Sequence, residues 1–518
     1  MLRRVSFAVA CSASLASAAA VVVPTIELAP PQGTFGLERR VASLSIEYAH
    51  LPIFGGNKTH PNQLTKNLVD ALVERTGVAP DVRPGGITVD SSVYDPTLTT
   101  DVQLVTSQSG GIYKTVFGPS YFEGLDVFGN SSRITFSVNL GNNTIGFAQA
   151  GAKAAVEKIG WKRLYALELG NEADHYSWGS SRPSTWASPD YTSQFLGWTQ
   201  YLQRNLSLPR NVWVAGGFAE DPTSSAPMTV KSIVREGVLE SHAVKLFAHH
   251  TYQYSTCDPP RNAIATLEHL VDHKNITAYL DLWKPQIEAS HAEGREFVVG
   301  EYNSVSCSGK QNVTDVFGQA LWLVDTILYG ASIGIARLHL HQGATLVFQS
   351  GNQANGPGFS WYDLWYPVDS ERYGAARAAP SFVSYLLIAE AVGKSDHAKI
   401  ALVNPPPEGG APDQVAIYAI WDASALSKIV VLNMAPRTEG AEETVTVDLS
   451  KYVGGGHGAT VKRMTSVGGL SEKNTTLTTW GGQSFTGGVP VGSLEIETLS
   501  ETGAVTLQGA EAVLVFLK

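Results

Sequence analysis

The sequence predicts an α/β fold, a (β/α)8 TIM barrel followed by a C-terminal antiparallel β-sandwich. Between residues 40 and 395, apolar β-rich runs alternate with amphipathic helical stretches, and eight such alternations are the pattern of a closed parallel barrel. Beyond this region the helical periodicity ends, and short β-rich runs are separated by Gly, Pro and Asn. No G-x-G-x-x-G follows the first strand, which argues against an open doubly wound sheet.

The barrel strands are predicted where apolar runs end in glycine or polar residues. They are expected at 41–48, 80–88, 133–140, 164–171, 212–219, 244–253, 296–303 and 335–342. Helices are expected between and after them, at 147–159, 193–206, 228–240, 262–293, 313–332 and 371–394. The stretch around 313–332 is the most apolar, but it contains Gln319 and Asp325, so we interpret it as a core helix and not as a membrane span.

Four segments follow from this interpretation. Residues 1–20 are predicted to be a secretory signal peptide, because two Arg precede a short apolar stretch that ends in small residues. An uncleaved membrane anchor is the alternative, although the apolar stretch is short for a spanning helix. Residues 21–39 are expected to hold a strand that joins the C-terminal sandwich, residues 40–395 form the catalytic barrel, and residues 396–518 form the sandwich.

Composition restricts the partners of the chain. The 518 residues carry a formal net charge of −10, and no cluster of Lys and Arg is present. An acidic surface disfavours phosphate and sulfate polyanions, so neither nucleic acid nor a highly sulfated chain is expected as the main partner. No segment beyond the N-terminal one is apolar over the roughly 18 residues that a spanning helix needs, so no membrane partner is expected.

Sequons and cysteines agree with a secreted, extracellular protein. N-x-S/T sequons, the acceptor sites of N-glycosylation, begin at Asn57, Asn130, Asn142, Asn205, Asn275, Asn312 and Asn474. Removal of the signal peptide takes away Cys11 and leaves Cys257 and Cys307. A single pair in an oxidising compartment predicts a disulfide, with two free buried thiols as the alternative.

Two glutamates stand where predicted strands end. Glu172 follows the fourth strand, in ELGNEADHY, and Glu301 ends the seventh, in FVVGEYNS. The carboxyl ends of the strands and the loops after them build the active site of a TIM barrel. Strands four and seven are nearly opposite in an eight-strand ring, so these carboxylates can flank a sugar. Glycoside hydrolysis needs such a pair, one to protonate the leaving oxygen and one to attack the anomeric carbon or activate water.

Other polar residues accompany the two glutamates. Arg83 ends the second strand, the pair His249-His250 and Tyr252 end the sixth, and His341 ends the eighth. Adjacent strand residues point to opposite faces and the histidines lack a spacing such as H-E-x-x-H, so neither a metal nor another cofactor is expected. His341 is interpreted as a pocket wall or sugar contact, with a hydrogen-bonded core histidine as the alternative. The alternative for each glutamate is a structural carboxylate paired with an Arg or a capping amide.

The stretches ELGNEADHY, VGEYNSVSC and RPGGIT, in a barrel followed by a sandwich, resemble glycoside hydrolase family 79, which comprises β-glucuronidases and their heparanase relatives. The secreted fungal-type β-glucuronidases are the closer likeness, and the resemblance covers essentially the whole mature chain. Asn-Glu after strand four is shared by a larger clan of retaining barrel glycosidases. The motif therefore specifies the mechanism more closely than the substrate.

The resemblance implies a role for each site residue. Glu172 would be the general acid/base and Glu301 the nucleophile of a double displacement with net retention, which requires carboxyl groups about 5–5.5 Å apart. Asn171 would hold the sugar 2-hydroxyl, and Tyr252 would hydrogen-bond Glu301 or the sugar ring. Arg83 and His341 complete the expected substrate-binding set.

The resemblance also implies a substrate. An exo-acting β-glucuronidase would release terminal glucuronic acid, with or without a 4-O-methyl group, from glycans or glycosides. The family typically holds the glucuronate carboxylate with tyrosine hydroxyls and backbone amides, whereas this chain has His341-Gln342-Gly343 after strand eight. A neutral-sugar β-glucosidase or β-xylosidase is therefore the alternative, and a non-catalytic carbohydrate-binding protein is an alternative of a different class.

Overall fold

The computed structural model describes residues 20–106, 111–178, 181–223, 225, 228–345, 358–403, 414–437, 444–453, 458–499 and 502–517. Residues 1–19 of the predicted signal peptide therefore lie outside the described residues. Within the described ranges, no helix has the length and apolarity needed to cross a membrane.

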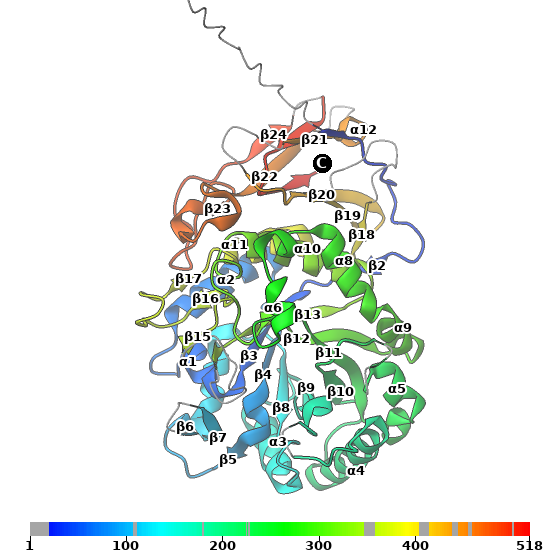
Figure 1. Cartoon of the computed structure of the whole chain (residues 1–518), viewed down its shortest axis with the longest axis vertical. Helices are drawn as coiled ribbons and strands as arrows, with labels where there is room; N and C mark the ends of the chain where they lie inside the picture. The colour runs from blue at the N-terminus through cyan, green and yellow to red at the C-terminus, as the bar shows by residue number, and fades with distance from the viewer. Residues whose placement is uncertain are drawn as a thin grey trace, which may run out of the picture.

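Eight parallel strands close into a barrel, which confirms the predicted fold class (Figure 1). Each strand lies at a predicted position, and the sixth and seventh extend two and three residues beyond their predicted ends. The strands in chain order are β3 (Ala42–Glu47), β4 (Val82–Gly85), β8 (Ile134–Val138), β9 (Leu164–Leu169), β10 (Trp213–Phe218), β11 (Val244–Ser255), β12 (Glu296–Ser306) and β13 (Arg337–Gln342).

Helices surround this ring of strands, as expected for the barrel (Figure 1). The longer ones begin and end at recognisable signals: Asn62 caps α2 by accepting from the Thr65 N–H, and Gly77 ends it at φ 75°. The main helices are α2 (Gln63–Thr76), α3 (Ile145–Ile159), α4 (Ser188–Leu206), α5 (Val230–Arg235), α8 (His273–Leu280), α9 (Lys284–Ala292), α10 (Gly318–Ser332) and α11 (Phe382–Val392).

The single helix predicted over 262–293 is wrong. The chain there forms α6 (Pro259–Ala263), α7 (Leu267–Leu270), α8, a 3-10 turn and α9. Thr266 accepts a hydrogen bond from the N–H of His269, and Asp272 accepts one from Asn275, so each side chain starts a new helix. Apolar periodicity continues across these breaks, because α7, α8 and α9 each bury apolar residues on one face.

A small sheet that was not predicted lies between β4 and β8. It contains β5 (Ser92–Tyr94), β6 (Val102–Thr106) and β7 (Ile112–Phe117), with β7 in the centre. Phe117 of β7 packs edge-on against Tyr48, which follows the first barrel strand. The sheet therefore stands at the end of the barrel where β3 and β4 finish.

The C-terminal region forms two facing sheets, as the predicted sandwich requires. One has the strand order β2-β18-β19-β20-β26-β22-β23 with β24 beside β22, and the other has the order β1-β21-β25. Their bounds are β2 (Phe35–Gly36), β18 (Ala398–Leu402), β19 (Val415–Asp422), β20 (Ala425–Asn433), β26 (Glu511–Phe516), β22 (Ala459–Ser466), β23 (Thr478–Trp480), β24 (Glu497–Leu499), β1 (Ala20–Val22), β21 (Val445–Asp448) and β25 (Ala504–Leu507).

The N-terminal segment contributes to both sheets but not as the single strand expected within residues 21–39. The strand β1 pairs in parallel with β21 and ends at Val22, and β2 pairs with β18. Between them the backbone N–H of Ile26 donates to the Tyr452 hydroxyl, so a side chain there takes the place of a strand partner.

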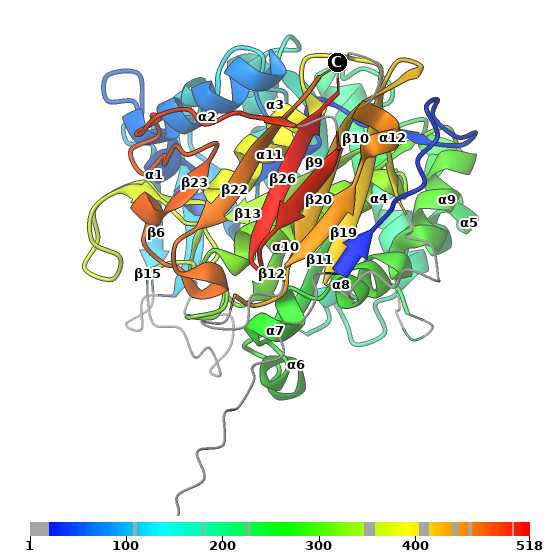
Figure 2. The ribbon, with the colours of Figure 1, turned by 90° about the horizontal axis from the view of Figure 1, so that it is seen from above.

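Both faces of the larger sheet are buried. Along β19, Ile417, Ala419 and Trp421 face the smaller sheet. Tyr418 and Ile420 alternate with them and join the main core under the barrel helices, as the two-residue period of a strand requires. Figure 2 shows the larger sheet lying across α10 and α11. The C-terminal sheets therefore cover one flank of the barrel.

The apolar helix α10 is buried between the barrel and this sheet, as predicted. Its polar residues Gln319 and Asp325 have partners on both sides. Asp325 accepts from the Tyr418 hydroxyl of the sheet and lies 2.9 Å from His273 Nδ1. Gln319 bonds to Asn303 and Ser304 of β12. A buried polar group is stable only when it is paired, so these bonds fix the helix against the strand that carries Glu301.

A disulfide joins Cys257 and Cys307, as predicted. Both cysteines lie just beyond β11 and β12, the two longest barrel strands, which are paired up to Ser255 and Ser306. The bond therefore closes the far end of the strand pair that carries Tyr252 and Glu301.

Replacing both cysteines by serine should lower the free energy of unfolding by about 4 kcal/mol, because the bond closes a loop with a sequence separation of 50 residues in the unfolded chain. Urea unfolding of the double variant and of wild type, each with and without reductant, measures this difference. A change below about 1 kcal/mol, or an equal effect of reductant on both proteins, would contradict the prediction.

Candidate active site

Glu172 leaves the fourth barrel strand through a sharp turn. Gly170 has φ 82°, and a Cβ there would lie 2.4 Å from the Tyr176 hydroxyl, so only glycine fits. Glu172 itself has φ 52° and ψ 53°, a conformation that is costly for a residue with a side chain. Strain of this kind persists where the surrounding structure enforces it, and here it turns the Glu172 carboxylate toward the barrel opening.

Glu301 lies within β12 and is held on several sides. The Tyr252 hydroxyl donates to its Oε1 at 2.8 Å, and Arg83 Nη1 donates to its Oε2 at 2.7 Å. His341 Nδ1 lies 3.6 Å from the same Oε2. These contacts leave 7% of the Glu301 side chain exposed, against 19% for Glu172.

The two carboxylates meet in one pocket. One oxygen of each, together with a ring nitrogen of His250, lies within 4.8 Å of the other two atoms. His250 Nδ1 is 3.0 Å from Glu172 Oε1. Arg83 already donates to Oε2 of Glu301, which disfavours a divalent cation among these three groups.

Arg83 lies beneath both carboxylates and is 1% exposed. Its Nε donates to Glu168, its Nη1 donates to Ser45 as well as Glu301, and its Nη2 donates to the Asn171 amide oxygen at 3.0 Å. All three nitrogens thus bond to protein oxygens. The contacts make Arg83 a positioning residue for Glu301 and Asn171, and Glu168 is its buried counter-ion.

The surroundings of Glu301 keep its carboxylate ionised. Burial raises the pKa of Glu301, but the positive charges of His341, His250 and Arg83 and the Tyr252 hydrogen bond outweigh it, and the pKa falls to about 2. The stabilisation that this ionised group gives the fold is present above the unfolded carboxyl pKa, about 4.3, and is lost as the pH falls through about 2. An ionised, buried carboxylate that is held in a fixed orientation is suited to nucleophilic attack.

His175 contacts the carboxylate of Glu172. Its Nδ1 is 3.7 Å from Glu172 Oε2, and its Nε2 is 3.3 Å from Glu220 Oε1. Burial lowers the pKa of His175, but the bond to Glu220 and the charges of Glu172 and Asp174 raise it to about 9. The ring is therefore an imidazolium at neutral pH. His249 takes no part, because it is fully buried among aromatic side chains outside the barrel.

Asp90 ties together the loops that follow three strands. Its carboxylate accepts hydrogen bonds from the N–H groups of Leu140, Gly141 and Asn171 and from the Tyr176 hydroxyl. Burial raises the pKa of Asp90 to about 6, although the four hydrogen bonds lower it. Asp90 therefore fixes the backbone immediately before Glu172.

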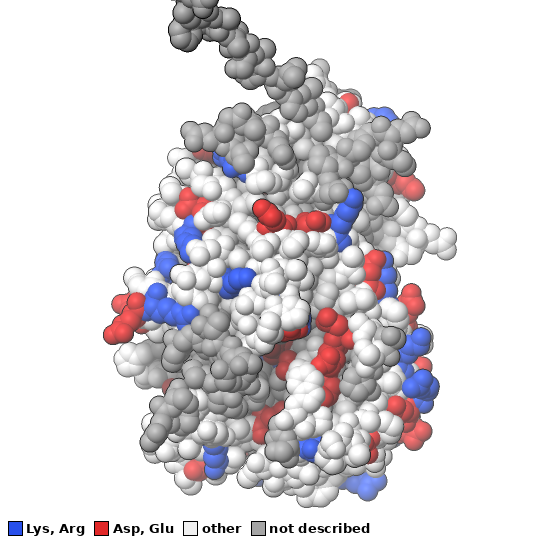
Figure 3. Space-filling view, viewed as in Figure 1, with Lys and Arg blue, Asp and Glu red and all other residues white. Residues whose placement is uncertain are grey.

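A cleft of about 790 Å³ opens beside Glu172. Asn171, Glu172, His175 and Tyr176 line one side of it, and β7 and the loop after β8 line the other. In Figure 3, Asp and Glu side chains gather around a hollow near the centre of one face of the molecule. The volume of the cleft beside Glu172, about 790 Å³, is in the range of ligand-binding pockets, about 300–1,000 Å³.

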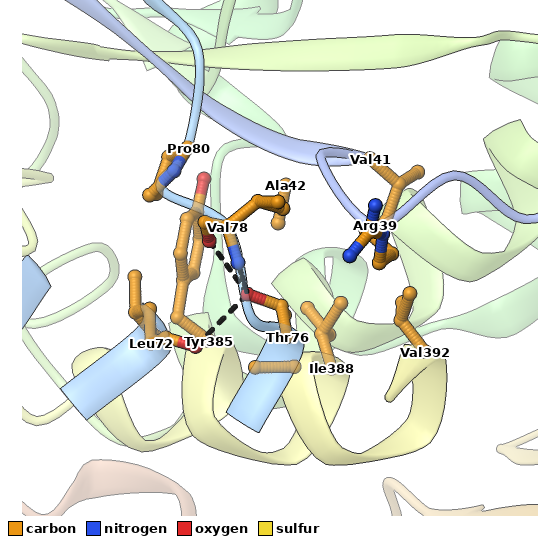
Figure 4. A pocket seen from close by; sticks show the side chains of 11 residues that line it. Arg39, Val41, Ala42, Leu72, Thr76, Val78, Pro80, Tyr385, Ile388 and Val392 are labelled. Atoms are coloured by element: carbon orange, nitrogen blue, oxygen red, sulfur yellow. Dashed lines mark hydrogen bonds between the residues drawn. The ribbon is translucent and has the colours of Figure 1, made fainter. Parts of the chain in front are cut away.

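A second cavity is far smaller. It lies between α2, α11 and the start of β3 and has a volume of about 20 Å³ (Figure 4). Its walls are mainly apolar, and the Thr76 hydroxyl donates to the carbonyls of Leu72 and Val78. This space holds at most about one water molecule, so it is a gap in the core and not a sugar site.

Comparisons with known proteins agree with this geometry. The model of the glycosyl hydrolase family 79 C-terminal beta domain matches residues 417–514. A β-glucuronidase of Aspergillus niger is 29% identical over 414 residues, which cover 76% of this chain and 71% of the relative. The C-terminal region therefore matches glycoside hydrolase family 79, and the chain is similar to β-glucuronidases over most of its length. A β-glucuronidase of Neurospora crassa is 28% identical over 441 residues, covering 80% of this chain and 75% of the relative.

Solved structures share this fold over nearly the whole chain. A 4-O-α-L-rhamnosyl-β-D-glucuronidase from Fusarium oxysporum has a TM-score of 0.79 and 23% identity, and the match covers 96% of this chain and 100% of that one. A family 51 α-L-arabinofuranosidase from Bifidobacterium longum follows with a TM-score of 0.60 and 14% identity, covering 97% of this chain and 100% of that one.

The structure brings the predicted site residues together. Glu301, Arg83, Asn171, Tyr252 and His341 lie in one connected set of hydrogen bonds and short charge contacts, and a Glu172 oxygen lies within 4.8 Å of a Glu301 oxygen. Sequence reasoning missed His175, Asp90 and Tyr362. The Tyr362 ring lies 6.4 Å from that of Tyr252, centroid to centroid. Asp90 and Tyr362 lie in segments that follow strands. Periodicity in the sequence does not indicate which side chains of such segments come close to the site.

Replacing Tyr252 by phenylalanine should move the acidic limb of the kcat/KM profile up by about 1 in pH, because it removes a hydrogen bond to the ionised form of Glu301 and so raises its pKa. Tyr254→Phe is the matched control, since its hydroxyl donates to the backbone carbonyl of His269. Ionisation of the substrate carboxyl group affects wild type and both variants equally, so it cannot produce a difference between their pH profiles. An unchanged limb in Tyr252→Phe would refute the prediction.

Proposed function

We propose that this protein is a secreted, exo-acting, retaining β-glucuronidase that releases terminal glucuronic acid, with or without a 4-O-methyl group, by double displacement. The observation that carries the mechanism is the separation of the two carboxylates, whose nearest oxygens lie within 4.8 Å of one another. Retaining enzymes need about 5–5.5 Å between the groups, whereas inverting ones need about 6.5–9.5 Å to admit a water.

The environments of the two carboxylates support different roles. Glu301 is buried, ionised and oriented by Tyr252 and Arg83, so one of its oxygens would attack C1 and form a glycosyl ester. Glu172 is more exposed and borders the cleft, so it would transfer its proton to the glycosidic oxygen as the C1–O bond breaks. The aglycone leaves as an alcohol. Glu172 would then take a proton from water, whose oxygen attacks C1 and releases Glu301 as a carboxylate.

Asn171 and Arg83 would connect the sugar to the nucleophile. The Asn171 amide oxygen is occupied by Arg83 Nη2 at 3.0 Å, which leaves the amide NH2 to donate to a sugar 2-hydroxyl. Hydrogen bonds to the 2-hydroxyl strengthen as the oxocarbenium-like transition state forms. Arg83 would thus hold the Asn171 amide and the Glu301 carboxylate in fixed positions relative to each other.

The choice of glucuronate rests on the relatives and on the residues near β13. Two relatives of 28% and 29% identity are named β-glucuronidases. Burial lowers the pKa of His341, but Glu301 and Glu47 raise it above its ordinary value, so the ring offers positive charge beside the sugar. The Tyr362 ring lies 6.5 Å from that of His341, and we propose these two residues as contacts of the substrate carboxylate.

Secretion is supported by features spread over the chain. The stretch 1–20 has the pattern of a signal peptide, none of the seven sequon asparagines is buried, and Cys257 and Cys307 are joined as oxidising conditions would allow. Exo action is supported by the charge of the cleft. Lys114 is the single Lys or Arg among the described residues that line it, which leaves no cationic track for a long sulfated chain.

Initial rates on matched 4-nitrophenyl β-glucuronide, β-glucoside and β-xyloside test the substrate. We expect kcat/KM for the glucuronide to exceed kcat/KM for each of the other two substrates by about 100-fold or more. A neutral sugar would leave the groups that bind the substrate carboxylate without a partner. Proton NMR of the first product should show the β-anomer before mutarotation. Preference for a neutral glycoside would overturn the glucuronate assignment, and an α-anomer would overturn the retaining mechanism.

A further inference from the structure

Arg182 is a buried cation that the proposed reaction does not use. Its side chain is 7% exposed, and it lies in the segment between β9 and α4. Its guanidinium donates to the carbonyls of Leu140, Gly141 and Ser181 and to the amide oxygen of Gln194. All of these partners are neutral groups, whereas a buried charge is stable only where other groups compensate it.

One peptide unit joins Arg182 to the carboxylate of Asp90. Arg182 Nη2 donates to the Leu140 carbonyl at 3.0 Å, and the Gly141 N–H of the same peptide unit donates to Asp90 Oδ1 at 2.8 Å. Opposite charges on its two sides polarise a peptide unit and strengthen both of its hydrogen bonds. A Cβ at Gly141 would lie 2.5 Å from the Asp90 Cβ, so this approach requires glycine.

Tyr176 joins the same two charged groups a second time. Its hydroxyl donates to Asp90 Oδ2 at 2.8 Å, and the guanidinium carbon of Arg182 lies 5.1 Å from the centre of its ring. A guanidinium over an aromatic face is attracted to it. Asp90, the 140–141 peptide unit, Arg182 and Tyr176 therefore form a closed ring of contacts, here called the loop clamp. It links the segments that follow β4, β8 and β9.

The loop clamp holds the backbone immediately before Glu172. The Asn171 N–H donates to Asp90 Oδ2 at 3.2 Å and to the Tyr176 hydroxyl oxygen at 3.3 Å. Glu172 has the left-handed φ of 52°, and such a conformation persists only where its surroundings enforce it. On the other side, the Glu172 N–H donates to the Gly217 carbonyl. Loss of the clamp would release one of these two constraints and let the Glu172 carboxylate shift.

The nucleophile is held in a different way. Glu301 lies within β12, and its hydrogen bonds come from Tyr252 of β11 and Arg83 of β4. Glu301 is therefore fixed by side chains within barrel strands, whereas Glu172 is fixed through segments that follow strands. Loss of the loop clamp should affect the acid more than the nucleophile.

We propose that Arg182, Tyr176 and Asp90 are positioning residues for the acid/base Glu172, and that they fix its carboxylate toward the glycosidic oxygen. The inference rests on the proposed function, because it takes Glu172 as the acid. The clamp transfers no proton itself but determines where the Glu172 proton is delivered. Its loss should therefore cost more for substrates whose leaving group needs a proton.

The test compares two aryl glucuronides that differ in this need. Phenyl β-glucuronide releases a basic phenoxide, whereas 2,4-dinitrophenyl β-glucuronide releases a stable anion. Rates are measured at pH 7, where Asp90, whose pKa burial raises to about 6, is ionised. We expect Arg182→Met and Tyr176→Phe each to lower kcat/KM for the phenyl glucuronide by about tenfold or more, because a displacement of about 1 Å can cost about 100-fold. For the dinitrophenyl glucuronide the fall should be below about threefold.

A double variant separates positioning from a general structural role. In the Glu172→Gln background, Tyr176→Phe should lower the two kcat/KM values by the same factor, because no acid remains to be positioned. Arg163→Met is the matched control, since Arg163 also donates to backbone carbonyls, those of Leu125 and Ser132, but at the opposite end of the barrel. Both of its kcat/KM values should stay within about twofold of wild type.

The outcomes distinguish the clamp from the proposed function. Tyr176→Phe keeps the aromatic ring, so it remains informative if Arg182→Met does not fold. Equal losses on the two substrates in folded variants, wild-type rates in Tyr176→Phe, or a selective loss that persists in the Glu172→Gln background would refute the clamp and leave the proposed function standing. If wild type hydrolyses neither glucuronide, the proposed function fails and the clamp fails with it.

Discussion

Replacing Glu301 by glutamine should lower kcat on 4-nitrophenyl β-glucuronide by about 10⁴-fold or more. Glutamine has nearly the same shape, but its amide cannot form the glycosyl ester. Burial alone would favour a neutral carboxyl here, yet His341, His250 and Arg83 hold the pKa of Glu301 at about 2, so the wild-type group is ready to attack throughout the working pH range. Steady-state rates of purified protein measure the loss.

The control for this variant is Glu296→Gln. Glu296 begins the same strand at the opposite end of the barrel and pairs with Arg337 instead of Arg83. We expect its kcat to stay within about twofold of wild type, because substitutions outside the site act mainly on stability. A Glu301→Gln protein that is folded by circular dichroism and keeps more than about 1% of wild-type kcat would remove Glu301 from the nucleophile role.

Trapping the intermediate identifies the attacking oxygen directly. A 2-deoxy-2-fluoro-β-glucuronide with a good leaving group should add one fluoroglucuronosyl group to wild type, because the fluorine destabilises both transition states while the leaving group rescues only the first. Peptide mapping should place the label on Glu301. Glu301→Gln should remain unlabelled, and a label on Glu172 or Glu168 would contradict the assignment.

Much of the barrel could be predicted because parallel strands buried on both sides leave a strong signal. Most of the eight runs are rich in apolar residues and end in a turn, as in VKLFAHHTYQ and EFVVGEYN. The helix predicted over 262–293 was wrong, because apolar spacing alone cannot show where Thr266 or Asp272 starts a new helix. The β5–β7 sheet was missed, because its short strands give too little periodicity to stand out from a loop.

The candidate site was predictable to the extent that it lies on strand ends. Glu301 and Tyr252 lie within barrel strands, so the register of β11 and β12 brings them together. His175 and Asp90 lie in short 3-10 helices between the strands and the next elements, where contact depends on how the backbone folds back. Glu172 falls between these cases: its position after β9 was visible in the sequence, but the left-handed backbone that aims it was not.

Replacing Glu172 by glutamine should affect substrates according to how much their leaving group needs a proton. We expect kcat/KM for methyl β-glucuronide to fall by about 10²–10⁴-fold, the usual contribution of general acid catalysis. For 2,4-dinitrophenyl β-glucuronide the fall should be below about tenfold, since that leaving group departs as a stable anion and needs no acid. Stopped and continuous assays on the same preparation give both values.

This contrast separates an acid from a merely structural carboxylate. Glu172 contacts His250 at 3.0 Å and lies near His175, so a loss of shape or charge there would impair both substrates alike. Glu301→Gln supplies the comparison, because loss of the nucleophile blocks the first step whatever the leaving group. With the dinitrophenyl substrate, kcat of Glu172→Gln should also fall and should recover on addition of azide, which attacks the glycosyl-enzyme without needing a base. Equal losses on both substrates, with no rescue by azide, would place Glu172 outside the proton transfer and leave the pocket without its acid.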